Sequence, residues 1–329
     1  MKVIRSLYRR ARDSARHHLW IFWENQPASR KSAVRNLLFS NASPLFAGTP
    51  LYLQWQEAKA YFDALHADTV ELFDLQKVAP LPSSEQRRVA VHAHIFYPEL
   101  ASSLRQYFEK FPARFDLFIS TPHENDRELL TSIFANCATI GQLTISITPN
   151  RGRDLAPMFT IFAKQLLAYD FICHVHTKKS LATNDIGQVW REYLWNGLLA
   201  NAGERLPKIW RLLENHALVY PQKFHWIDVS NCQWGANYTQ GIALCQNLDI
   251  DLPQNGFIEF PAGSMFWARA ASLAPLLQLG LQMEDFDEER GQTDYTLAHA
   301  LERMLGFVPL AQGEKIALIK NPLFLNHYP

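Results

Sequence analysis

The chain has 329 residues, of which 48% are hydrophobic and 19% are charged, ordinary values for a globular protein with a sizeable core. Lysine plus arginine and aspartate plus glutamate both number 32, so the formal net charge is zero. This balance argues against a nucleic acid as partner, because such binding usually needs a basic excess. Nine tryptophans fit either a large core or a surface that faces carbohydrate or a membrane edge.

The cysteines and the absence of long apolar runs predict a cytoplasmic protein. There are four isolated cysteines and no C-x-x-C pair, a pattern typical of a reducing compartment. No apolar run approaches the roughly 20 residues of a membrane-spanning helix. The basic start of the chain is not followed by the apolar core and cleavage site of a signal peptide.

Residues 1–86 are predicted to form an N-terminal helical extension and a linker. Val3, Ile4 and Leu7 recur at helical spacing between arginines, and the aromatic run 19–23 follows. This pattern favours peripheral contact with the inner face of the cytoplasmic membrane; the alternative is a helix packed on the main domain with a solvated basic face. A second helix is expected over residues 51–73, and the prolines and serines of 77–88 indicate a linker.

From residue 87 to the end, strand and helix patterns alternate. Apolar strands are expected within 87–98, 115–122, 143–154 and 171–180, with helices over 98–112, 124–137 and 155–170 between them. Continuous apolar strands joined by helices predict an α/β fold with a mostly parallel sheet and helices on both faces. Ligands in such sheets bind at the carboxyl ends of the strands, where polar residues stand here.

Several common motifs are missing. No G-x-G-x-x-G follows the first strand, no G-x-x-x-x-G-K-[ST] occurs, and no G-x-S-x-G is present. The sequence therefore does not predict a dinucleotide fingerprint, a P-loop or a nucleophile elbow.

The segment "TPNRGRDLAP", residues 148–157, indicates an anion site. Gly152 permits a tight turn, and the helix expected after it favours anions at its N-terminus. Arg151 and Arg153 can hold a phosphate, while Asp154 can cap the helix or hold a ribose or base donor. The alternative is a plain capped turn with an Arg–Asp surface pair.

Two His-x-His pairs lie on two predicted parallel strands. Alternation places His174 and His176 of "FICHVHTKKS" on one face, and His92 and His94 of "VAVHAHIF" form the second pair. Such pairs can bind a metal, for which His174 and His176 are the alternative ligands. The lysines at 178 and 179 would repel a metal and suit a diphosphate better, with His176 donating a hydrogen bond; strand-end histidines bonded to carbonyls are the third alternative.

The C-terminal part supplies carboxylates. Residues 260–281 predict a strand, a polar break and a helix, and an acidic run that includes Glu284 and Asp285 follows. Asp294 is expected just inside the next helix, where a carboxylate either compensates the helix dipole or faces a cleft as a general base.

The order of these motifs resembles the rhamnan synthesis F protein family. The resemblance extends from about Arg88 to Leu305 and is carried by "HAHIFYPEL", "NRGRD", "HTKKS", "FPAGSMFWAR" and "GQTDYTLAHALERML". It implies a bacterial glycosyltransferase for rhamnose-containing polysaccharide or O-antigen. "NRGRD" and "DYTL" are also similar to segments of inverting GT-A glycosyltransferases, which implies a GT-A-like fold with Asp294 as the base that activates the acceptor. The acidic metal motif of those enzymes is replaced here by "HVHTKKS".

The resemblance therefore implies an inverting transfer from a nucleotide diphosphate sugar, such as dTDP-L-rhamnose, to a lipid-linked or polysaccharide acceptor. Metal independence is favoured over a requirement for Mg²⁺ or Mn²⁺, since lysine and histidine could neutralise the leaving diphosphate. The expected donor contacts are Tyr97, Thr121, Asn150, Arg151, Gly152, Arg153, Asp154, His176, Lys178 and Lys179. Trp234, Trp267, Glu284 and Asp285 are expected at the acceptor or sugar subsite, although both tryptophans also fit a core. The alternatives are a metal-dependent hydrolase built on the paired histidines and a non-catalytic glycan-binding or assembly protein.

Overall fold

The computed structural model describes residues 28–177, 186–224, 227, 232–252, 256–292 and 294–320, together with 14 and 18. Its centre is an eight-stranded sheet with the order β1-β8-β6-β7-β5-β2-β3-β4. The strands are β1 (Val70–Phe73), β2 (Val89–His94), β3 (Phe115–Thr121), β4 (Ile140–Ile147), β5 (Phe171–His176), β6 (Leu218–Pro221), β7 (Phe266–Arg269) and β8 (Ile316–Ile319). Among these strands only β7 runs antiparallel to its neighbours, β5 and β6.

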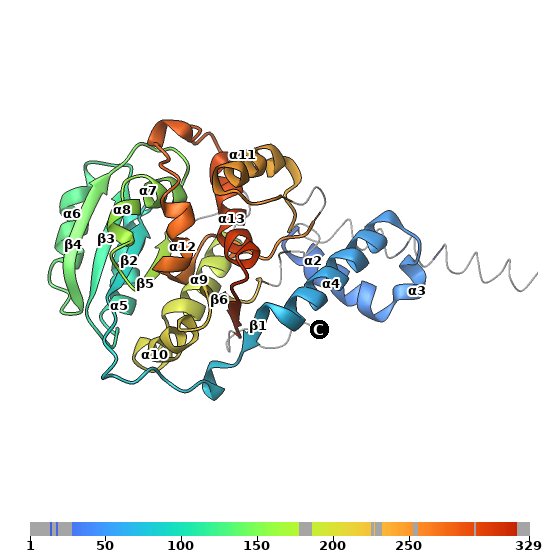
Figure 1. Cartoon of the computed structure of the whole chain (residues 1–329), viewed down its shortest axis with the longest axis horizontal. Coiled ribbons are helices and arrows are strands. Elements are labelled where there is room, and N and C mark those ends of the chain that lie inside the picture. Colours follow the sequence, from blue (N-terminus) through green and yellow to red (C-terminus); the bar gives the residue numbers. More distant parts are fainter. Residues whose placement is uncertain are drawn as a thin grey trace, which may run out of the picture.

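Helices cover both faces of this sheet (Figure 1). They are α2 (Ala28–Asn41), α3 (Ser43–Phe46), α4 (Pro50–Asp68), α5 (Ala101–Phe108), α6 (Asp126–Phe134), α7 (Leu155–Phe159), α8 (Ala163–Leu166), α9 (Ile186–Leu199), α10 (Ala202–Leu213), α11 (Tyr238–Leu248), α12 (Ala270–Leu277) and α13 (Leu297–Ala311). The arrangement confirms the predicted Rossmann-like α/β class.

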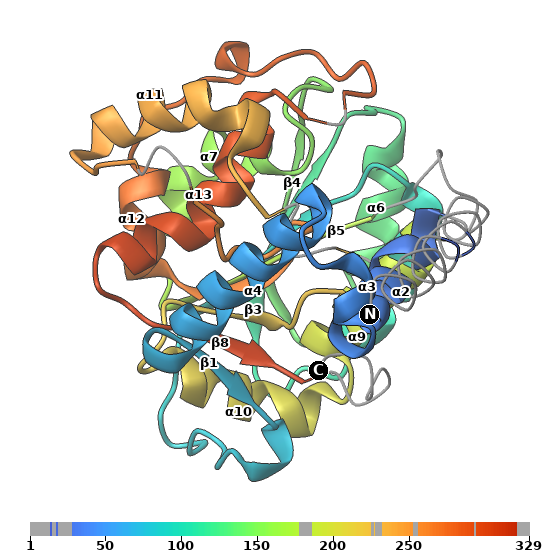
Figure 2. The ribbon, with the colours of Figure 1, turned by 90° about the vertical axis from the view of Figure 1, so that its right-hand side faces the viewer.

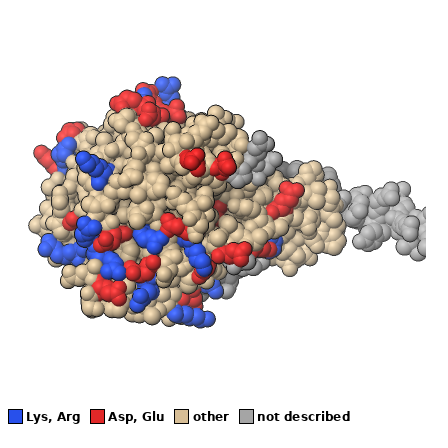
Figure 3. Space-filling model, viewed as in Figure 1, with Lys and Arg blue, Asp and Glu red and all other residues tan. Residues whose placement is uncertain are grey.

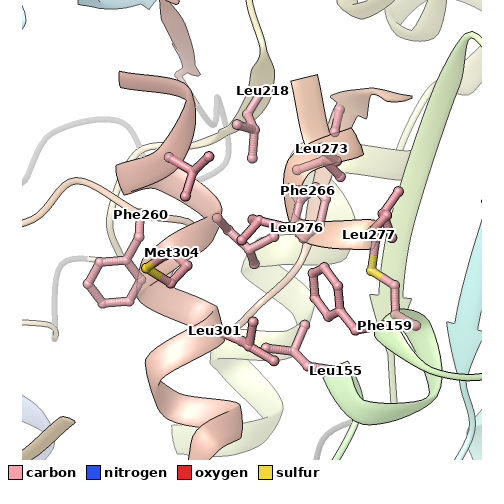
Figure 4. Packing of buried hydrophobic residues seen from close by; sticks show 14 of the residues in the cluster. Leu155, Phe159, Leu218, Phe260, Phe266, Leu273, Leu276, Leu277, Leu301 and Met304 are labelled. Carbon is pink, nitrogen blue, oxygen red and sulfur yellow. The ribbon is translucent and has the colours of Figure 1, made fainter. Parts of the chain in front are cut away.

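Two hydrophobic cores, one on each face, hold the helices to the sheet. Every residue of β2 and β5 is buried, as expected for parallel strands covered on both sides. The first core joins the sheet to α7, α8, α11, α12 and α13, and Figure 4 shows Phe159, Phe266, Leu276 and Leu301 converging there. The second core joins the opposite face to α5, α6, α9 and α10.

The N-terminal part of the chain differs from its prediction. The helix expected over residues 51–73 ends at Asp68, and Val70–Phe73 forms β1, which pairs in parallel with β8. Figure 2 shows α4 leading into β1 at the edge of the sheet. The sheet therefore includes residues on the N-terminal side of the predicted boundary at 86/87. The segment after the 3-10 turn Leu75–Lys77 contains no helix or strand up to β2, as expected for a linker.

Helices α2 to α4 project from the body of the protein in Figure 1. Phe39, Tyr52 and Trp55 form a small aromatic cluster of their own there, whereas Phe62 further along α4 belongs to the first core. The basic helix predicted near the start of the chain and the aromatic run 19–23 lie outside the described residues. No helix in the described part of the chain combines the length and apolar character needed to cross a bilayer.

Two other elements depart from the prediction. The helix expected over residues 155–170 is divided into α7 and α8. In the C-terminal part the polar break precedes the strand, so that the loop 260–265 leads into β7 and α12 follows it directly. The loop thereby lies next to the carboxyl end of β5, since β7 pairs with β5 in the antiparallel sense.

Candidate functional site

The carboxyl ends of β2 and β5 form the point where the strand order reverses. The chain runs from β2 outward through β3 and β4 and then returns to β5 on the other side of β2. The Thr177 N–H donates to the His94 carbonyl at 3.0 Å, and the Tyr97 N–H donates to Thr177 Oγ1 at 2.9 Å. Open α/β sheets bind ligands at such switch points, so this edge is the candidate site.

Four buried histidines lie side by side at this edge. His92 pairs with His174 and His94 with His176 in the parallel register of β2 and β5. The Nδ1 atoms of His92 and His174 are 2.9 Å apart, and their rings stack with centroids at 4.9 Å. The prediction of two His-x-His pairs on two parallel strands is confirmed, and the structure shows in addition that these strands are neighbours. Burial, followed by the proximity of His174, holds the pKa of His92 well below its ordinary value.

Asp154 closes the turn between β4 and α7 and points into this cluster. It precedes α7 at the cap position, but its side chain makes no capping hydrogen bond. Instead it accepts hydrogen bonds from His174 Nε2 at 3.1 Å and from the Ser264 hydroxyl. Burial alone would raise the pKa of Asp154, but the neighbouring His176, His174 and Ser264 outweigh it and hold this pKa well below the usual range.

The loop before β7 completes the cluster. The carbonyl of Gly263 accepts a hydrogen bond from His176 Nε2 at 2.9 Å, and its N–H donates to Glu302 of α13 at 2.7 Å. Gly263 and Ser264 both have positive φ, at 91° and 53°. Five non-glycine residues of the described chain have positive φ, and three of them, Arg153, Ser264 and Tyr295, lie around this site. Such sparsely populated backbone conformations concentrate at functional sites.

The two arginines of the turn bind the acidic segment 284–292. Arg151 donates to the Phe286 carbonyl at 2.8 Å and forms an ion pair with Glu288 at 3.3 Å. Arg153 forms an ion pair with Glu289 at 2.8 Å. Both guanidinium groups thus hold this segment against the turn. This agrees with the alternative of an arginine surface pair, except that the partners are glutamates and not Asp154.

Asp294 lies just before α13, not inside it, because the helix begins at Leu297 with Thr296 as its cap. The fully buried Asn237 donates to Asp294 Oδ1 and accepts from the Tyr295 N–H at 3.0 Å. An Arg303 nitrogen lies 3.7 Å from the same carboxylate oxygen, whose side chain is 37% exposed. The carboxylate is therefore held in place while it keeps access to solvent.

The charges of both Arg153 and Asp294 act on His299. Burial, and after it the charge of Arg153, lowers the pKa of His299 to about 4, while Asp294 and Glu289 act in the opposite direction. Its Nδ1 is 2.7 Å from Thr296 Oγ1, and its Nε2 is buried without a hydrogen-bond partner. Since Glu302 of the same helix bonds the loop at Gly263, the start of α13 lies beside the histidine cluster.

The other predicted contacts occupy different environments. Trp267 is fully buried in the second core, where its Nε1 donates to the Leu198 carbonyl, and Trp234 is buried in the first core. Thr121 is buried and its hydroxyl lacks a partner, whereas Asn150 is exposed. Glu284 and Asp285 are exposed, and Asp285 caps the 3-10 turn Met283–Asp285. Both tryptophans thus match the core alternative, and Lys178 and Lys179 lie outside the described residues.

The donor set at the end of β5 does not suit a divalent metal. Both ring nitrogens of His174 are engaged, one by His92 and the other by Asp154, and the Asp154 oxygen is shared with Ser264. Mg²⁺ and Mn²⁺ favour oxygen ligands, and among the residues that the structure describes Asp154 is the carboxylate hydrogen-bonded to these histidines. Within the described ranges no group of three or more His, Cys, Asp or Glu side chains is placed to hold a metal ion.

Ser120, Ser264, Asn237 and Glu302 are site residues that the sequence interpretation missed. Ser120 is the residue before the last one of β3 and Ser264 follows a glycine, so polarity near a strand end and the "PAGS" break were available signals. Asn237 stands in the "NCQWGANY" segment, whose tryptophan was predicted as the site residue.

Comparison with known proteins identifies the family. The model of rhamnan synthesis protein F matches residues 61–314, which include every described residue of the site. Two relatives, both called uncharacterized protein WxcX, come from Xanthomonas campestris pv. campestris strains B100 and ATCC 33913 and are 33% and 32% identical over 184 residues. The matched segment is 55% of this chain and 26% of each relative, so it spans about a quarter of their length. Because the family model matches well over half of the chain, this protein belongs to the rhamnan synthesis protein F family.

Proposed function

We propose that this protein is a glycosyltransferase that moves a sugar from a nucleotide diphosphate sugar to a bacterial surface polysaccharide or O-antigen acceptor. Family membership supports polysaccharide synthesis as the setting and L-rhamnose as the first candidate sugar. The observation that carries the proposal is a cluster of charged and imidazole side chains at the switch point of a mostly parallel sheet. This sheet is compatible with the GT-A-like fold that the sequence resemblance implies.

The lysines after β5 are proposed to stabilise the leaving diphosphate. Thr177 is buried at the switch point, and Lys178 and Lys179 follow it directly in the chain. Negative charge grows on the diphosphate in the transition state, so fixed cations there lower the barrier without a divalent ion. The lysines carry this role in preference to Arg151 and Arg153, whose guanidinium groups are paired with glutamates.

Asp294 is proposed as the general base. Its carboxylate is oriented by Asn237 and Arg303 and remains partly exposed, so an acceptor hydroxyl can approach it. Removal of the hydroxyl proton as the oxygen attacks the anomeric carbon gives a single displacement with inversion. The acceptor is proposed to be lipid-linked or polymeric, and the basic N-terminal segment to bring the protein to the membrane surface.

A thermal-shift screen against nucleotide sugars, with and without Mg²⁺ or Mn²⁺, tests donor binding and metal use together. A ligand that binds only the folded state raises Tm by mass action. We expect dTDP-L-rhamnose or a related deoxysugar nucleotide to raise Tm in the presence of a chelator.

In the double variant Lys178→Ala/Lys179→Ala, this shift should shrink or vanish. The matched control is Lys110→Ala, a distant exposed lysine. If the ligand raises Tm of the double variant as much as that of the wild type, the lysines do not bind the diphosphate. If no nucleotide sugar in the screen raises Tm of the wild type, the result counts against the proposed function itself.

A further inference from the structure

A continuous chain of hydrogen bonds connects Asp154 to the carboxyl end of β2. His174 Nε2 is 3.1 Å from Asp154 Oδ2, and His174 Nδ1 is 2.9 Å from His92 Nδ1. His92 Nε2 is 3.0 Å from Ser120 Oγ, which is 2.8 Å from His94 Nδ1. The chain crosses three neighbouring strands, β5, β2 and β3, and each of its members is buried.

When His174 is neutral, the acceptor at one end sets the direction of every bond. The Asp154 carboxylate only accepts, so the hydrogen of His174 is on Nε2 and its Nδ1 carries a lone pair when the ring is neutral. His92 must then donate from Nδ1, which leaves its Nε2 as an acceptor for the single hydroxyl hydrogen of Ser120. The lone pairs of Ser120 Oγ in turn accept from His94 Nδ1–H.

His94 consequently presents a lone pair at Nε2. This atom has no hydrogen-bond partner among the described residues, and His94, the last residue of β2, is 7% exposed. Burial, partly offset by Asp154, lowers the pKa of His94 to about 3, which keeps the ring neutral. The position is the switch point of the sheet, where a ligand is expected.

We propose that His94 Nε2 accepts a hydrogen bond from a hydroxyl or N–H group of the bound nucleotide sugar, and that the chain from Asp154 fixes it as an acceptor. The identity of the ligand rests on the proposed function; the hydrogen position on His94 does not. An acceptor held in one tautomer discriminates against analogues that lack the matching donor group, because its lone pair is then left unpaired. His94 is thus a residue that binds the nucleotide sugar. The residues that position it are Asp154, His174, His92 and Ser120.

The hydrogen position can be read by long-range ¹H–¹⁵N NMR of the full chain labelled with ¹⁵N-histidine, with His94→Gln used to assign the signal. We expect wild-type His94 to be protonated at Nδ1 and unprotonated at Nε2. Ser120→Ala interrupts the hydrogen-bond chain and should shift His94 toward the Nε2–H form. The control is Ser146→Ala, since Ser146 is the register partner of Ser120 on β4, and it should leave the tautomer of His94 unchanged. A protonated Nε2 in the wild-type protein would mean that the bonds run in the opposite direction and would overturn the inference.

Titration with dTDP-L-rhamnose tests the ligand contact. The Nε2 signal should move on binding, and Ser120→Ala should weaken binding about three- to tenfold, the effect of one hydrogen bond, with Ser146→Ala unchanged. The contact is overturned if the nucleotide sugar binds without moving the His94 Nε2 signal of the wild-type protein and if Ser120→Ala binds it with wild-type affinity. Failure of the wild-type protein to bind any nucleotide sugar would overturn the contact together with the proposed function, yet leave the measured tautomer standing, so the two failures are distinguishable.

Discussion

Gly152 occupies a position that only glycine fills without strain. Its φ is 58°, and a Cβ at this residue would lie 2.3 Å from Phe286 Cδ1 and 2.6 Å from Ala156 Cβ. The turn therefore brings the acidic segment and α7 against the backbone at the one residue without a side chain. The neighbouring Arg153 and Asp154 depend on this turn for their contacts to Glu289 and His174.

Gly152→Ala should destabilise the protein by about 2–4 kcal/mol, because the positive φ and the overpacking both cost free energy. Gly313→Ala is the matched control, since Gly313 also has positive φ, at 77°, but no atom lies within 4 Å of the added Cβ. Its cost should stay near 1 kcal/mol. Chemical denaturation measures both values, and equal losses would show that the contact with Phe286 is unimportant.

The buried histidines predict a loss of stability in mild acid. His299 has a pKa lowered to about 4, so between about pH 6.5 and 4 the unfolded chain binds a proton there that the folded chain does not. Stability therefore rises with pH across this window and falls by up to about 3 kcal/mol toward its lower end. His92 and His94 act in the same direction.

In a Tm series from pH 7 to pH 4.5, His299→Gln should show a shallower decline than the wild-type protein. The exposed His123→Gln should follow the wild-type curve. If Tm falls with pH equally steeply in His299→Gln and in the wild type, His299 does not stay neutral in the folded protein.

At the scale of elements, the main sheet extends further toward the N-terminus than the sequence predicted. The pattern of residues 51–73 reads as one helix, yet its last four residues pair with β8, with Val70 opposite Ile316, 246 positions later in the chain. A strand of four residues carries too little periodicity to be recognised, and a pairing over such a separation leaves no local signal. The alternating strands and helices after residue 87 were predictable because their apolar positions are continuous or recur at helical spacing.

Because Phe62 of α4 is buried in the first core, we expect helix α4 to unfold together with the main body of the protein. Phe62→Ala should destabilise the main unfolding transition by about 3–5 kcal/mol, on the order of 10 °C in Tm. Phe39→Ala removes a ring of similar burial from the separate aromatic cluster and should leave that transition unchanged. Calorimetry of both variants measures the two changes in Tm. Equal changes would mean that α2 to α4 unfold together with the body of the protein. An unchanged Tm for Phe62→Ala would favour the predicted domain boundary at 86/87.

The contacts of the candidate site were less predictable than its strands. Alternation placed His174 and His176 on one face of their strand, and the structure adds that His92 and His94 lie beside them on the neighbouring strand β2. Their partners come from elsewhere: Ser120 is 28 residues from His92, and Ser264 is 110 residues from Asp154. The arginines were expected to face a phosphate, but the glutamates that hold them follow 136 to 137 residues later. Tertiary contacts of this separation are set by topology, which a single sequence does not reveal.

At the scale of the whole molecule, one edge of the sheet gathers the chemistry. The ends of β2 and β5, the turn before α7, the loop before β7 and the start of α13 meet there through hydrogen bonds of Asp154, His176 and Glu302. On the face shown in Figure 3, basic and acidic side chains intermingle without a broad field of one sign, in keeping with the zero net charge. An extended polyanion would need a broad basic field, which this face does not present.

The most direct test of the central claim is turnover of a nucleotide diphosphate sugar by the purified protein with a polysaccharide or lipid-linked acceptor. The wild-type protein should release nucleotide diphosphate and form a glycosidic bond of inverted anomeric configuration. Asp294→Asn should lower kcat by about 10²–10⁴-fold while donor affinity stays near that of the wild type, and Asp251→Asn, at an exposed aspartate without a role in the site, should remain fully active. Near-normal turnover by Asp294→Asn, or a product with retained configuration, would contradict the account.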